Sequence, residues 1–409
     1  MKHNRYIESN INSVCFSAGK MAFISGPRQC GKTTMAKMLL QQRGSGVYYN
    51  WDEIKFRRLW TKDPSAILPK IINHEKPLVI LDELHKAKLW KRNLKGLYDT
   101  AEDAYDMLVT GSARLNVYRK GSDSLMGRYY HFRLHPFSVS ELMDGKFFHD
   151  PDDLIQTLLS HTKKTSAESM KNFDNLLQFG PFPEPLFAAN KRTLNLWQRN
   201  RIEKIIREDL RDMSRLPELS QVEMLASLLP ERVAQPMSIQ ALSEDLEVAY
   251  TTVKRWLNYF NQLYYCFNLK PFAKSLARAI KKENKLYLWD WSEVENPGAR
   301  FENLVACHLL KYCDYLTDTG VGTFELRYIK NKEKQEIDFI IMRDKKVFLP
   351  IEVKVSDTQP SPSWSKFLTQ LNCPVGVQLV MQSNTHKTVD YSGQKIVVMT
   401  AADFLQYLI

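Results

Sequence analysis

The chain has 409 residues with a formal net charge of +11, and its length predicts about two to four domains. Its hydrophobic content of 44% and charged content of 25% exclude a disordered or fibrous protein. No stretch approaches the roughly 18 apolar residues that span a bilayer, and the first residues lack a signal-peptide core. Six scattered cysteines without a C-x-x-C pair indicate reduced thiols, so we expect a cytoplasmic protein. The excess of positive charge favours a polyanionic partner such as nucleic acid.

The first part of the chain alternates strand and helix patterns. Short apolar runs predict strands at 21–25, 47–51, 78–81 and 107–110, and the segment 32–42 predicts a helix. The run at 78–81 is continuously apolar, which is typical of a strand buried on both faces. Strands separated by helices predict a parallel sheet covered by helices.

A glycine-rich loop stands between the first predicted strand and helix. The segment 26–33 reads GPRQCGKT and fits G-x-x-x-x-G-K-[ST] in full. In such a loop the backbone N–H groups turn toward phosphate oxygens, and the helix N-terminus adds partial positive charge. We expect Lys32 to reach the β- and γ-phosphates of ATP, and the Thr33 hydroxyl to ligate Mg²⁺. The residues predicted to bind nucleotide are Gly26, Pro27, Arg28, Gln29, Cys30, Gly31, Lys32, Thr33, Thr34 and, from the next motif, Asp82.

Two carboxylates end the apolar strand at 78–81. This position would place Asp82 beside the metal, and Glu83 would orient and polarise the attacking water. The strand at 107–110 ends near Thr110 and Ser112, whose hydroxyls could hydrogen-bond that water or the γ-phosphate. ATP binding follows from the loop, whereas hydrolysis depends on the placement of Glu83.

Arg128, in the segment SLMGR at 124–128, is the candidate arginine for the γ-phosphate. An arginine at that position speeds hydrolysis by roughly 10³–10⁵. It would act within its own chain or on a neighbouring subunit. The alternative is an ordinary surface arginine.

Residues 237–265 show a helix–turn–helix pattern, with Ser238 as the cap of its first helix. The second helix would bury Val253, Trp256, Leu257 and Phe260 and expose Thr252, Lys254, Arg255 and Asn258. From 254 to 285 there are eight basic residues against one acid. The basic residues are Lys254, Arg255, Lys270, Lys274, Arg278, Lys281, Lys282 and Lys285. A recognition helix followed by a basic wing would hold DNA phosphates, and a winged helix used only for packing is the alternative.

Four polar residues stand out in the last part of the chain. Glu302 lies in a predicted helix, and Asp338, Glu352 and Lys354 lie on predicted strands. Residues two apart on a strand share a face, and a hairpin around 343–346 would bring Asp338 alongside. This is the layout of PD-(D/E)XK nucleases: Asp338 and Glu352 would bind Mg²⁺, Lys354 would position water, and Glu302 would support the metal. The alternatives are a hairpin with solvated charges, or a pocket that binds DNA without cutting it.

Four segments together resemble the prokaryotic predicted AAA-plus ATPases that carry a C-terminal nuclease-like domain. They read GPRQCGKTT, VILDELHK, LVTGSAR and SLMGRYYHFRLHPFSVSEL. The resemblance continues into GPFPE at 180–184, where that family usually has a second glycine and this chain has Pro181. It covers nearly the whole chain and implies the AAA-plus ATPase class.

We therefore expect an α/β protein with a P-loop NTPase parallel sheet of AAA-plus type, a helical lid, a winged helix and a C-terminal restriction-endonuclease-like domain. The expected domains are the ATPase core at 1–150, the lid or linker at 151–230, the winged helix at 231–295 and the nuclease-like domain at 296–409. The expected function is that of a Mg²⁺-dependent ATPase that acts on DNA or is regulated by it. The expected C-terminal domain is a Mg²⁺-dependent nuclease. The alternatives are an ATP-dependent switch with a protein partner or as a homo-oligomer, and a DNA-binding regulator, each with a non-catalytic C-terminal module.

Overall fold

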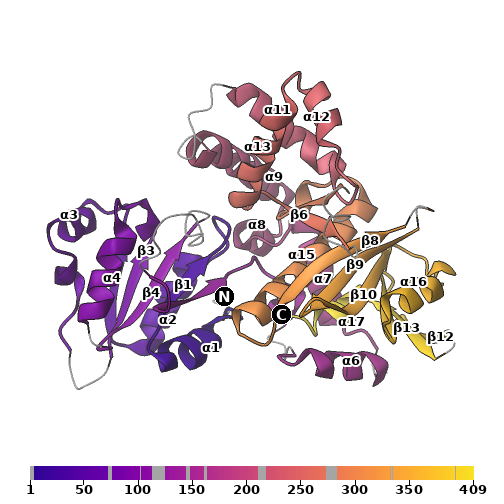
Figure 1. Ribbon diagram of the computed structural model, residues 1–409, viewed down its shortest axis with the longest axis horizontal. Coiled ribbons are helices and arrows are strands. Elements are labelled where there is room, and N and C mark those ends of the chain that lie inside the picture. Colours follow the sequence, from indigo (N-terminus) through magenta and orange to yellow (C-terminus); the bar gives the residue numbers. More distant parts are fainter. Residues whose placement is uncertain are drawn as a thin grey trace. The chain divides into compact units, whose positions relative to one another are not determined.

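The computed structural model describes residues 4–71, 76–101, 103–112, 125–143, 148–160, 164–210, 218–272, 283–331, 333, 335–391 and 393–409. The chain divides into two compact units, Met1–Pro136 and Phe137–Ile409 (Figure 1). The first unit thus ends earlier than the core expected at 1–150. The reason is that α5 (Val139–Leu142) packs against α7 (Ala167–Phe179) and α17 (Ala401–Leu405) of the second unit.

The first unit contains a five-stranded parallel sheet in the order β2-β3-β4-β1-β5. The strands are β1 (Met21–Ser25), β2 (Gly46–Asn50), β3 (Leu78–Asp82), β4 (Asp106–Gly111) and β5 (Tyr129–Arg133). The four strands expected from the sequence are present, and their parallel pairing is confirmed. The fifth strand was not expected, because only Phe132 of its residues is buried and the segment lacks a continuous apolar run.

Helices cover this sheet and complete its core. The helix α2 (Lys32–Arg43) contacts β2, β3 and β4. Phe23 of β1 packs in one cluster with Phe56 and Trp60 of α3 and with Leu94 of α4. The remaining elements are α1 (Glu8–Asn10), η1 (Ile11–Cys15), η2 (Phe16–Ala18), α3 (Ile54–Lys62), η3 (Pro64–Ile67), η4 (Leu84–Lys86) and α4 (Trp90–Thr100).

The second unit begins with helices. They are α6 (Pro151–Ser160), α8 (Pro183–Ala188), α9 (Lys191–Lys204), η6 (Ile205–Leu210), α11 (Leu219–Leu228), η7 (Leu229–Arg232), α12 (Ile239–Asp245) and α13 (Tyr250–Gln262). The expected helix–turn–helix is formed by α12 and α13, and the Ser238 hydroxyl accepts a hydrogen bond from Ala241 N. The four inward positions of α13 are buried, whereas Lys254, Arg255 and Asn258 are exposed.

An eight-stranded mixed sheet forms the rest of the second unit, in the order β12-β13-β11-β10-β9-β8-β6-β7. Its strands are β6 (Cys266–Pro271), β7 (Lys285–Leu288), β8 (Phe324–Lys330), β9 (Glu336–Arg343), β10 (Lys346–Lys354), β11 (Val375–Val380), β12 (His386–Tyr391) and β13 (Gln394–Thr400). Helical segments between them are η8 (Trp291–Glu293), α15 (Pro297–Asp318) and α16 (Ser363–Leu371). Trp364 and Phe367 of α16 pack against Ile337 and Ile340 of β9.

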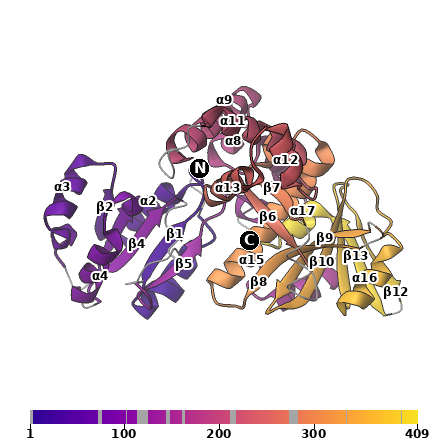
Figure 2. The ribbon, with the colours of Figure 1, turned by 45° about the horizontal axis from the view of Figure 1, so that its top comes forward.

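The hairpin β6–β7 joins the helix–turn–helix to this sheet. β6 follows α13 directly, pairs antiparallel with β7 and pairs parallel with β8 through Lys270 and Pro271 (Figure 2). The expected wing is therefore part of the C-terminal sheet. This continuity is why the structure shows no division at residue 296, where the sequence suggested a domain boundary.

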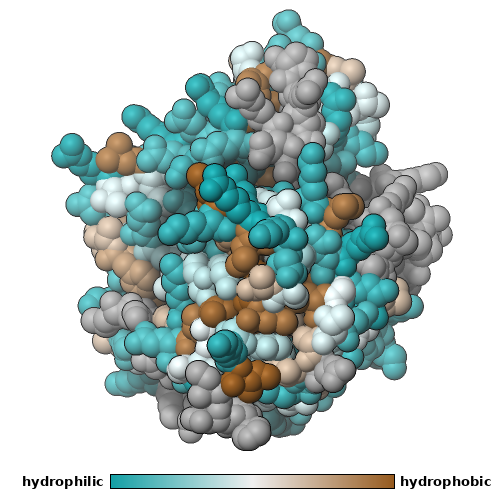
Figure 3. Space-filling model, turned by 90° about the vertical axis from the view of Figure 1, so that its left-hand side faces the viewer, coloured by the Kyte–Doolittle hydropathy of each residue, from teal (hydrophilic) through white to brown (hydrophobic). Residues whose placement is uncertain are grey.

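The surface is mostly hydrophilic on the face in Figure 3, where apolar areas are interrupted by polar ones. Within the described ranges, no helix has both the length and the apolar character needed to cross a bilayer.

Candidate functional site

The backbone of the phosphate loop adopts conformations that favour glycine. Gln29 and Gly31 have φ angles of +62° and +100°, in the left-handed region. A Cβ added to Gly26 would lie 2.2 Å from the carbonyl oxygen of Leu134, so no larger residue fits there. Lys32 is buried, and its Nζ donates hydrogen bonds to the carbonyl oxygens of Gly26 (3.0 Å) and Pro27 (2.6 Å). The ammonium group therefore lies within the loop, while Thr34 in the next turn is exposed.

The Asp82 carboxylate is the centre of a hydrogen-bond network at the end of β3. Its Oδ2 accepts hydrogen bonds from Thr33 Oγ1 and from the Tyr48 hydroxyl, each at 2.7 Å. Its Oδ1 accepts one from Thr110 Oγ1. The structure thus brings together Thr33, Asp82 and Thr110, which the sequence singled out. Tyr48 was missed, because a tyrosine on a neighbouring strand carries no motif. Burial, and then the Asp82 carboxylate, raise the pKa of Tyr48 well above its ordinary value.

Glu83 directly follows this network. Its backbone has a positive φ of 57°, and its N–H donates to the carbonyl oxygen of Thr110 at 3.0 Å. Its carboxylate is partly exposed, with Oε2 3.6 Å from both Lys86 Nζ and His85 Nε2. Ser112, also considered for the γ-phosphate, is buried at the end of β4. Glu83 therefore stands beside the metal-ligand candidate with a carboxylate that solvent can reach.

Arg128 and the phosphate loop of the same chain lie at opposite ends of the parallel strands β1 and β5. It immediately precedes β5, and its carbonyl oxygen accepts a hydrogen bond from the N–H of Met21, the first residue of β1. β1 and β5 are parallel, whereas the loop follows Ser25 at the other end of β1. The guanidinium instead bonds Asp99 through Nε (2.6 Å) and Nη2 (3.0 Å). This geometry contradicts the expectation that Arg128 reaches the γ-phosphate bound by its own chain.

Arg5 contacts the phosphate loop, although no sequence motif indicates this contact. Its side chain is buried, and Nη1 donates to the carbonyl oxygen of Cys30 at 2.6 Å. Nη2 donates to the carbonyl oxygen of His135 at 2.5 Å. These partners are 25 and 130 residues away along the chain, so no local pattern could have revealed the contact. Arg5 joins the loop to the segment that follows β5.

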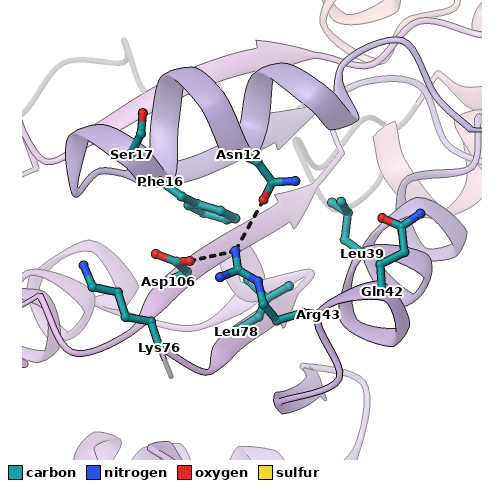
Figure 4. A pocket seen from close by; sticks show the side chains of 9 residues that line it. All are labelled: Asn12, Phe16, Ser17, Leu39, Gln42, Arg43, Lys76, Leu78 and Asp106. Atoms are coloured by element: carbon teal, nitrogen blue, oxygen red, sulfur yellow. Dashed lines mark hydrogen bonds and ion pairs between the residues drawn. The ribbon is translucent and has the colours of Figure 1, made fainter. Parts of the chain in front are cut away.

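A cavity of about 540 Å³ opens at the sheet edge opposite the phosphate loop (Figure 4). Arg43, the last residue of α2, pairs there with Asp106 at 2.8 Å and donates to Asn12 Oδ1 at 3.3 Å. Burial raises the pKa of Asp106, and the charge of Arg43 opposes this. Arg43 and Asp106 are therefore paired with each other, whereas Lys76, which also lines the cavity, pairs with Asp103.

A cluster of carboxylates lies around Lys285 in the second unit. Lys285 Nζ is 3.0 Å from Glu302 Oε1, 3.5 Å from Asp338 Oδ1 and in contact with Glu336. Burial disfavours the ammonium charge, but the three carboxylates outweigh this and raise the pKa of Lys285. Burial and the nearby Asp338 raise the pKa of Glu302, although Lys285 opposes the shift. We call Lys285, Glu302, Glu336 and Asp338 the lysine–carboxylate cluster.

Glu352 and Lys354 lie next to this cluster on β10. Lys354 Nζ is 2.7 Å from Glu352 Oε1, and Asp338 Oδ2 accepts a hydrogen bond from Val353 N at 2.9 Å. The predicted quartet of Glu302, Asp338, Glu352 and Lys354 thus comes from adjoining elements, α15, β9 and β10. Burial raises the pKa of Glu352, and the ion pair with Lys354 opposes this. The sequence missed the part played by Glu336 and Lys285.

The structure supports only part of the basic wing that was expected from the sequence. Lys285 is 1% exposed and belongs to the lysine–carboxylate cluster, so it is not available to DNA. Four other basic residues of that stretch lie outside the described residues, namely Lys274, Arg278, Lys281 and Lys282. Lys254, Arg255 and Lys270 are exposed. A count of charges could not separate a buried lysine from exposed ones.

Family comparisons divide the chain into three segments. Residues 18–143 match a family described as an AAA domain. Residues 170–293 and 297–403 match two domains of unknown function, DUF8612 and DUF4143.

Three relatives, each described as an uncharacterized protein, align with most of this chain. Protein MJ1544 of Methanocaldococcus jannaschii is 23% identical over 355 residues, which is 83% of this chain and 76% of that protein. Protein MJ1637 of the same organism is 22% identical and spans 94% of this chain and 85% of its own length. A protein of Haemophilus influenzae is 21% identical and spans 78% of each chain.

Two solved structures show weak overall similarity. The Aeropyrum pernix ORC1 protein in complex with DNA aligns with a TM-score of 0.34 and 12% identity, covering 75% of this chain and 93% of that one. AMPPCP-bound DnaA from Aquifex aeolicus aligns with a TM-score of 0.32 and 11% identity, covering 63% and 86%. Similarity at this level carries no argument about the present chain. The segment that matches the AAA domain family, residues 18–143, contains both the phosphate loop and the strand that ends in Asp82.

Proposed function

We propose that the first unit binds ATP with Mg²⁺ and hydrolyses it. The observation that carries this proposal is the hydrogen bond of 2.7 Å between Thr33 Oγ1 and Asp82 Oδ2. It links the helix that follows the phosphate loop to the end of β3. A hydroxyl and a carboxylate oxygen at this separation suit Mg²⁺, which prefers a few hard oxygen ligands together with phosphate oxygens.

Each residue of this network has a defined task in the proposed reaction. The buried Lys32 ammonium would bind the β- and γ-phosphate oxygens, and the loop N–H groups would hold the remaining phosphate charge. Bound with ATP, Mg²⁺ would neutralise the charge that develops on these oxygens. Glu83, partly exposed beside Asp82, would orient the attacking water and accept its proton. Thr110 holds Asp82 in position from the adjacent strand.

Steady-state phosphate release tests this proposal. The wild-type protein should release phosphate from ATP in Mg²⁺, and Lys32→Ala should lose both ATP binding and turnover. Thr193→Ala, on α9 of the second unit, is a control outside the proposed site. An unchanged rate in Lys32→Ala would show that the phosphate loop is not the site of hydrolysis.

A second function, DNA contact by the second unit, is favoured by the exposed face of α13. Lys254 and Arg255 are exposed beside Asn258, on the helix that follows the turn. Basic side chains in this arrangement would bind phosphates, with an affinity that falls steeply as salt rises. In a gel-shift titration, the double variant Lys254→Ala/Arg255→Ala should bind duplex DNA less tightly and with a smaller salt slope. The control variant Lys191→Ala/Arg192→Ala changes exposed positions of α9. If it binds DNA as tightly as the wild-type protein, the loss of affinity is specific to α13.

A further inference from the structure

We propose that the ammonium group of Lys285 takes the cation position of the lysine–carboxylate cluster, so that this site holds no divalent metal and does not cut DNA. The sequence assigned Mg²⁺ to Asp338 and Glu352. The residues present do not fit that assignment, because the positive charge beside Asp338 comes from the chain itself. Nζ lies 3.0 Å from Glu302 Oε1 and 3.5 Å from Asp338 Oδ1.

The position of Lys285 is fixed by its backbone as well as by its charge. Its residue pairs with Leu269 in the β6–β7 hairpin and forms a bridge with Pro236. Its side chain is 2% exposed, and its Nζ also lies 5.6 Å from the ring centroid of Tyr328. A lysine held in this way from several sides cannot swing into solvent without disturbing the hairpin.

The oxygens of Glu302 and Asp338 that face a metal position are already hydrogen-bonded, whereas Glu352 Oε2 is buried without a hydrogen-bond partner among the described residues. Glu302 Oε1 accepts from both Lys285 and the Tyr287 hydroxyl, the latter at 2.7 Å. Asp338 Oδ2 accepts from Val353 N at 2.9 Å. Mg²⁺ demands near-octahedral geometry at about 2.0–2.1 Å and would have to replace these bonds beside a resident ammonium. Among the described residues, no group of three or more His, Cys, Asp or Glu side chains is arranged to hold a metal ion.

The cavity on the Glu302 side of the cluster is also unsuited to a DNA strand. Glu302 lines a cavity of about 690 Å³ whose wall includes Glu231, Glu293 and Glu295. The described residues that line it include no lysine or arginine. Phosphates entering this cavity would meet carboxylates of the same sign, without the basic groups that usually hold a nucleic-acid backbone.

It follows that the lysine–carboxylate cluster binds the β6–β7 hairpin to α15 and β9 rather than performing chemistry. Of the readings that the sequence allowed for the C-terminal domain, this selects the non-catalytic one. The inference does not depend on ATP hydrolysis by the first unit, and it can be tested in the absence of nucleotide.

The experiment counts bound Mn²⁺ per chain by electron paramagnetic resonance, without nucleotide. Wild type and Asp338→Asn should bind the same number of ions, because no metal uses Asp338. Lys285→Met should gain one site with at least about tenfold tighter binding than any weak background, and Lys285→Met/Asp338→Asn should lose that gain. Lys285→Arg should behave like wild type, since it keeps the positive charge. Lys270→Met, at an exposed position in the same hairpin, is the matched control.

Three results would overturn the proposal, two from Mn²⁺ binding and one from DNA cleavage. One is a loss of bound Mn²⁺ in Asp338→Asn relative to wild type. Another is a folded Lys285→Met variant, judged by circular dichroism, that gains no site. If Lys285→Met does not fold, the comparison of wild type with Asp338→Asn still decides the question. Mg²⁺-dependent plasmid nicking by wild type that disappears in Asp338→Asn would also contradict it.

Discussion

The guanidinium of Arg5 donates a 2.6 Å hydrogen bond to the carbonyl oxygen of Cys30, which lies inside the phosphate loop. Its other nitrogen, Nη2, donates to the carbonyl oxygen of His135 at 2.5 Å. Hydrogen bonds from a charged donor contribute about 1.5–3 kcal/mol each when buried. A residue near the start of the chain therefore holds the loop in the shape that its N–H groups need for phosphate.

Replacing this arginine should weaken ATP binding. In Arg5→Ala, the carbonyl oxygens of Cys30 and His135 lose a buried donor and the loop becomes free to change shape. We expect the dissociation constant for a fluorescent ATP analogue to rise about tenfold, which corresponds to roughly 1.4 kcal/mol. Arg58→Ala, at an exposed position of α3, should bind the analogue like wild type. A folded Arg5→Ala protein with unchanged affinity would mean that the loop holds its shape without this residue.

Glu83 should affect turnover much more than binding. The change Glu83→Gln keeps the shape of the side chain but removes the negative charge that polarises the attacking water. We expect phosphate release to fall by about 10²–10⁴, the range of general-base catalysis, with ATP affinity within about threefold of wild type. Stopped-flow binding and phosphate release separate the two quantities. Glu53→Gln, at an exposed position before α3, is the control; equal turnover in Glu83→Gln and wild type would assign the water to another residue.

The ion pair of Arg128 with Asp99 should matter little to ATP turnover within its own chain. The two side chains form a two-point ion pair at the sheet edge opposite the phosphate loop. Because exposed ion pairs contribute little, Arg128→Ala and Asp99→Ala should both turn over ATP at close to the wild-type rate in dilute solution.

A neighbouring subunit would give a different result. If Arg128 acts across subunits, Arg128→Ala loses turnover, and mixing it with Lys32→Ala restores part of the rate. The mixture would then contain one intact arginine and one intact phosphate loop at the same interface. Asp99→Ala provides the comparison, since it breaks the same ion pair but leaves the arginine in place.

The buried imidazole of His308 should make the second unit less stable in acid. Its Nδ1 lies 2.8 Å from the carbonyl oxygen of Leu304, and its Nε2 accepts from Val139 N at 3.2 Å, which requires the neutral ring. Burial lowers the pKa of His308 to about 3, whereas the unfolded chain titrates near 6.5. The unfolded state therefore binds the extra proton between these values. The stability due to the neutral ring is complete above about pH 6.5 and is lost progressively as the pH falls toward 3.

Urea unfolding at a series of pH values measures this contribution. One such group changes the free energy of unfolding by at most about 1.4 kcal/mol per pH unit. His308→Gln should be less stable than wild type at pH 7 and should show a smaller loss between pH 6.5 and 4. His386→Gln, on the partly exposed strand β12, should keep the wild-type pH dependence. Parallel pH profiles for wild type and His308→Gln would contradict the assignment.

The sequence predicted the parts of the candidate nucleotide site that lie in short motifs. Lys32, Thr33 and Asp82 occupy fixed places in short motifs, and those motifs sit on elements that the apolar pattern already identifies. Arg5 and Tyr48 reach the same site from other segments. Their contacts depend on how the sheet and the N-terminal segment pack, and no spacing rule records that.

The C-terminal site also depends on contacts between distant segments, which the sequence motifs did not predict. The sequence predicted one helix and two strands that carry the polar residues of this site, and the structure places them on adjoining elements. These residues are Glu302, Asp338, Glu352 and Lys354. The decisive residue was Lys285, which the charge count assigned to a DNA-binding wing. Charge in a sequence does not reveal burial, and the position of Lys285 follows from the pairing of β7 with β6 and from its ion pairs with Glu302 and Asp338.

The pairing of β6 with β8 also has a practical consequence for anyone who dissects the chain. A fragment starting at residue 296 would lack the hairpin, and the backbone groups of β8 that face it would be left open. An uncovered strand of this kind readily pairs with other molecules and leads to aggregation. The same fragment would leave Glu302, Glu336 and Asp338 without their ammonium partner. A piece that keeps residues 137–409 whole would retain both features.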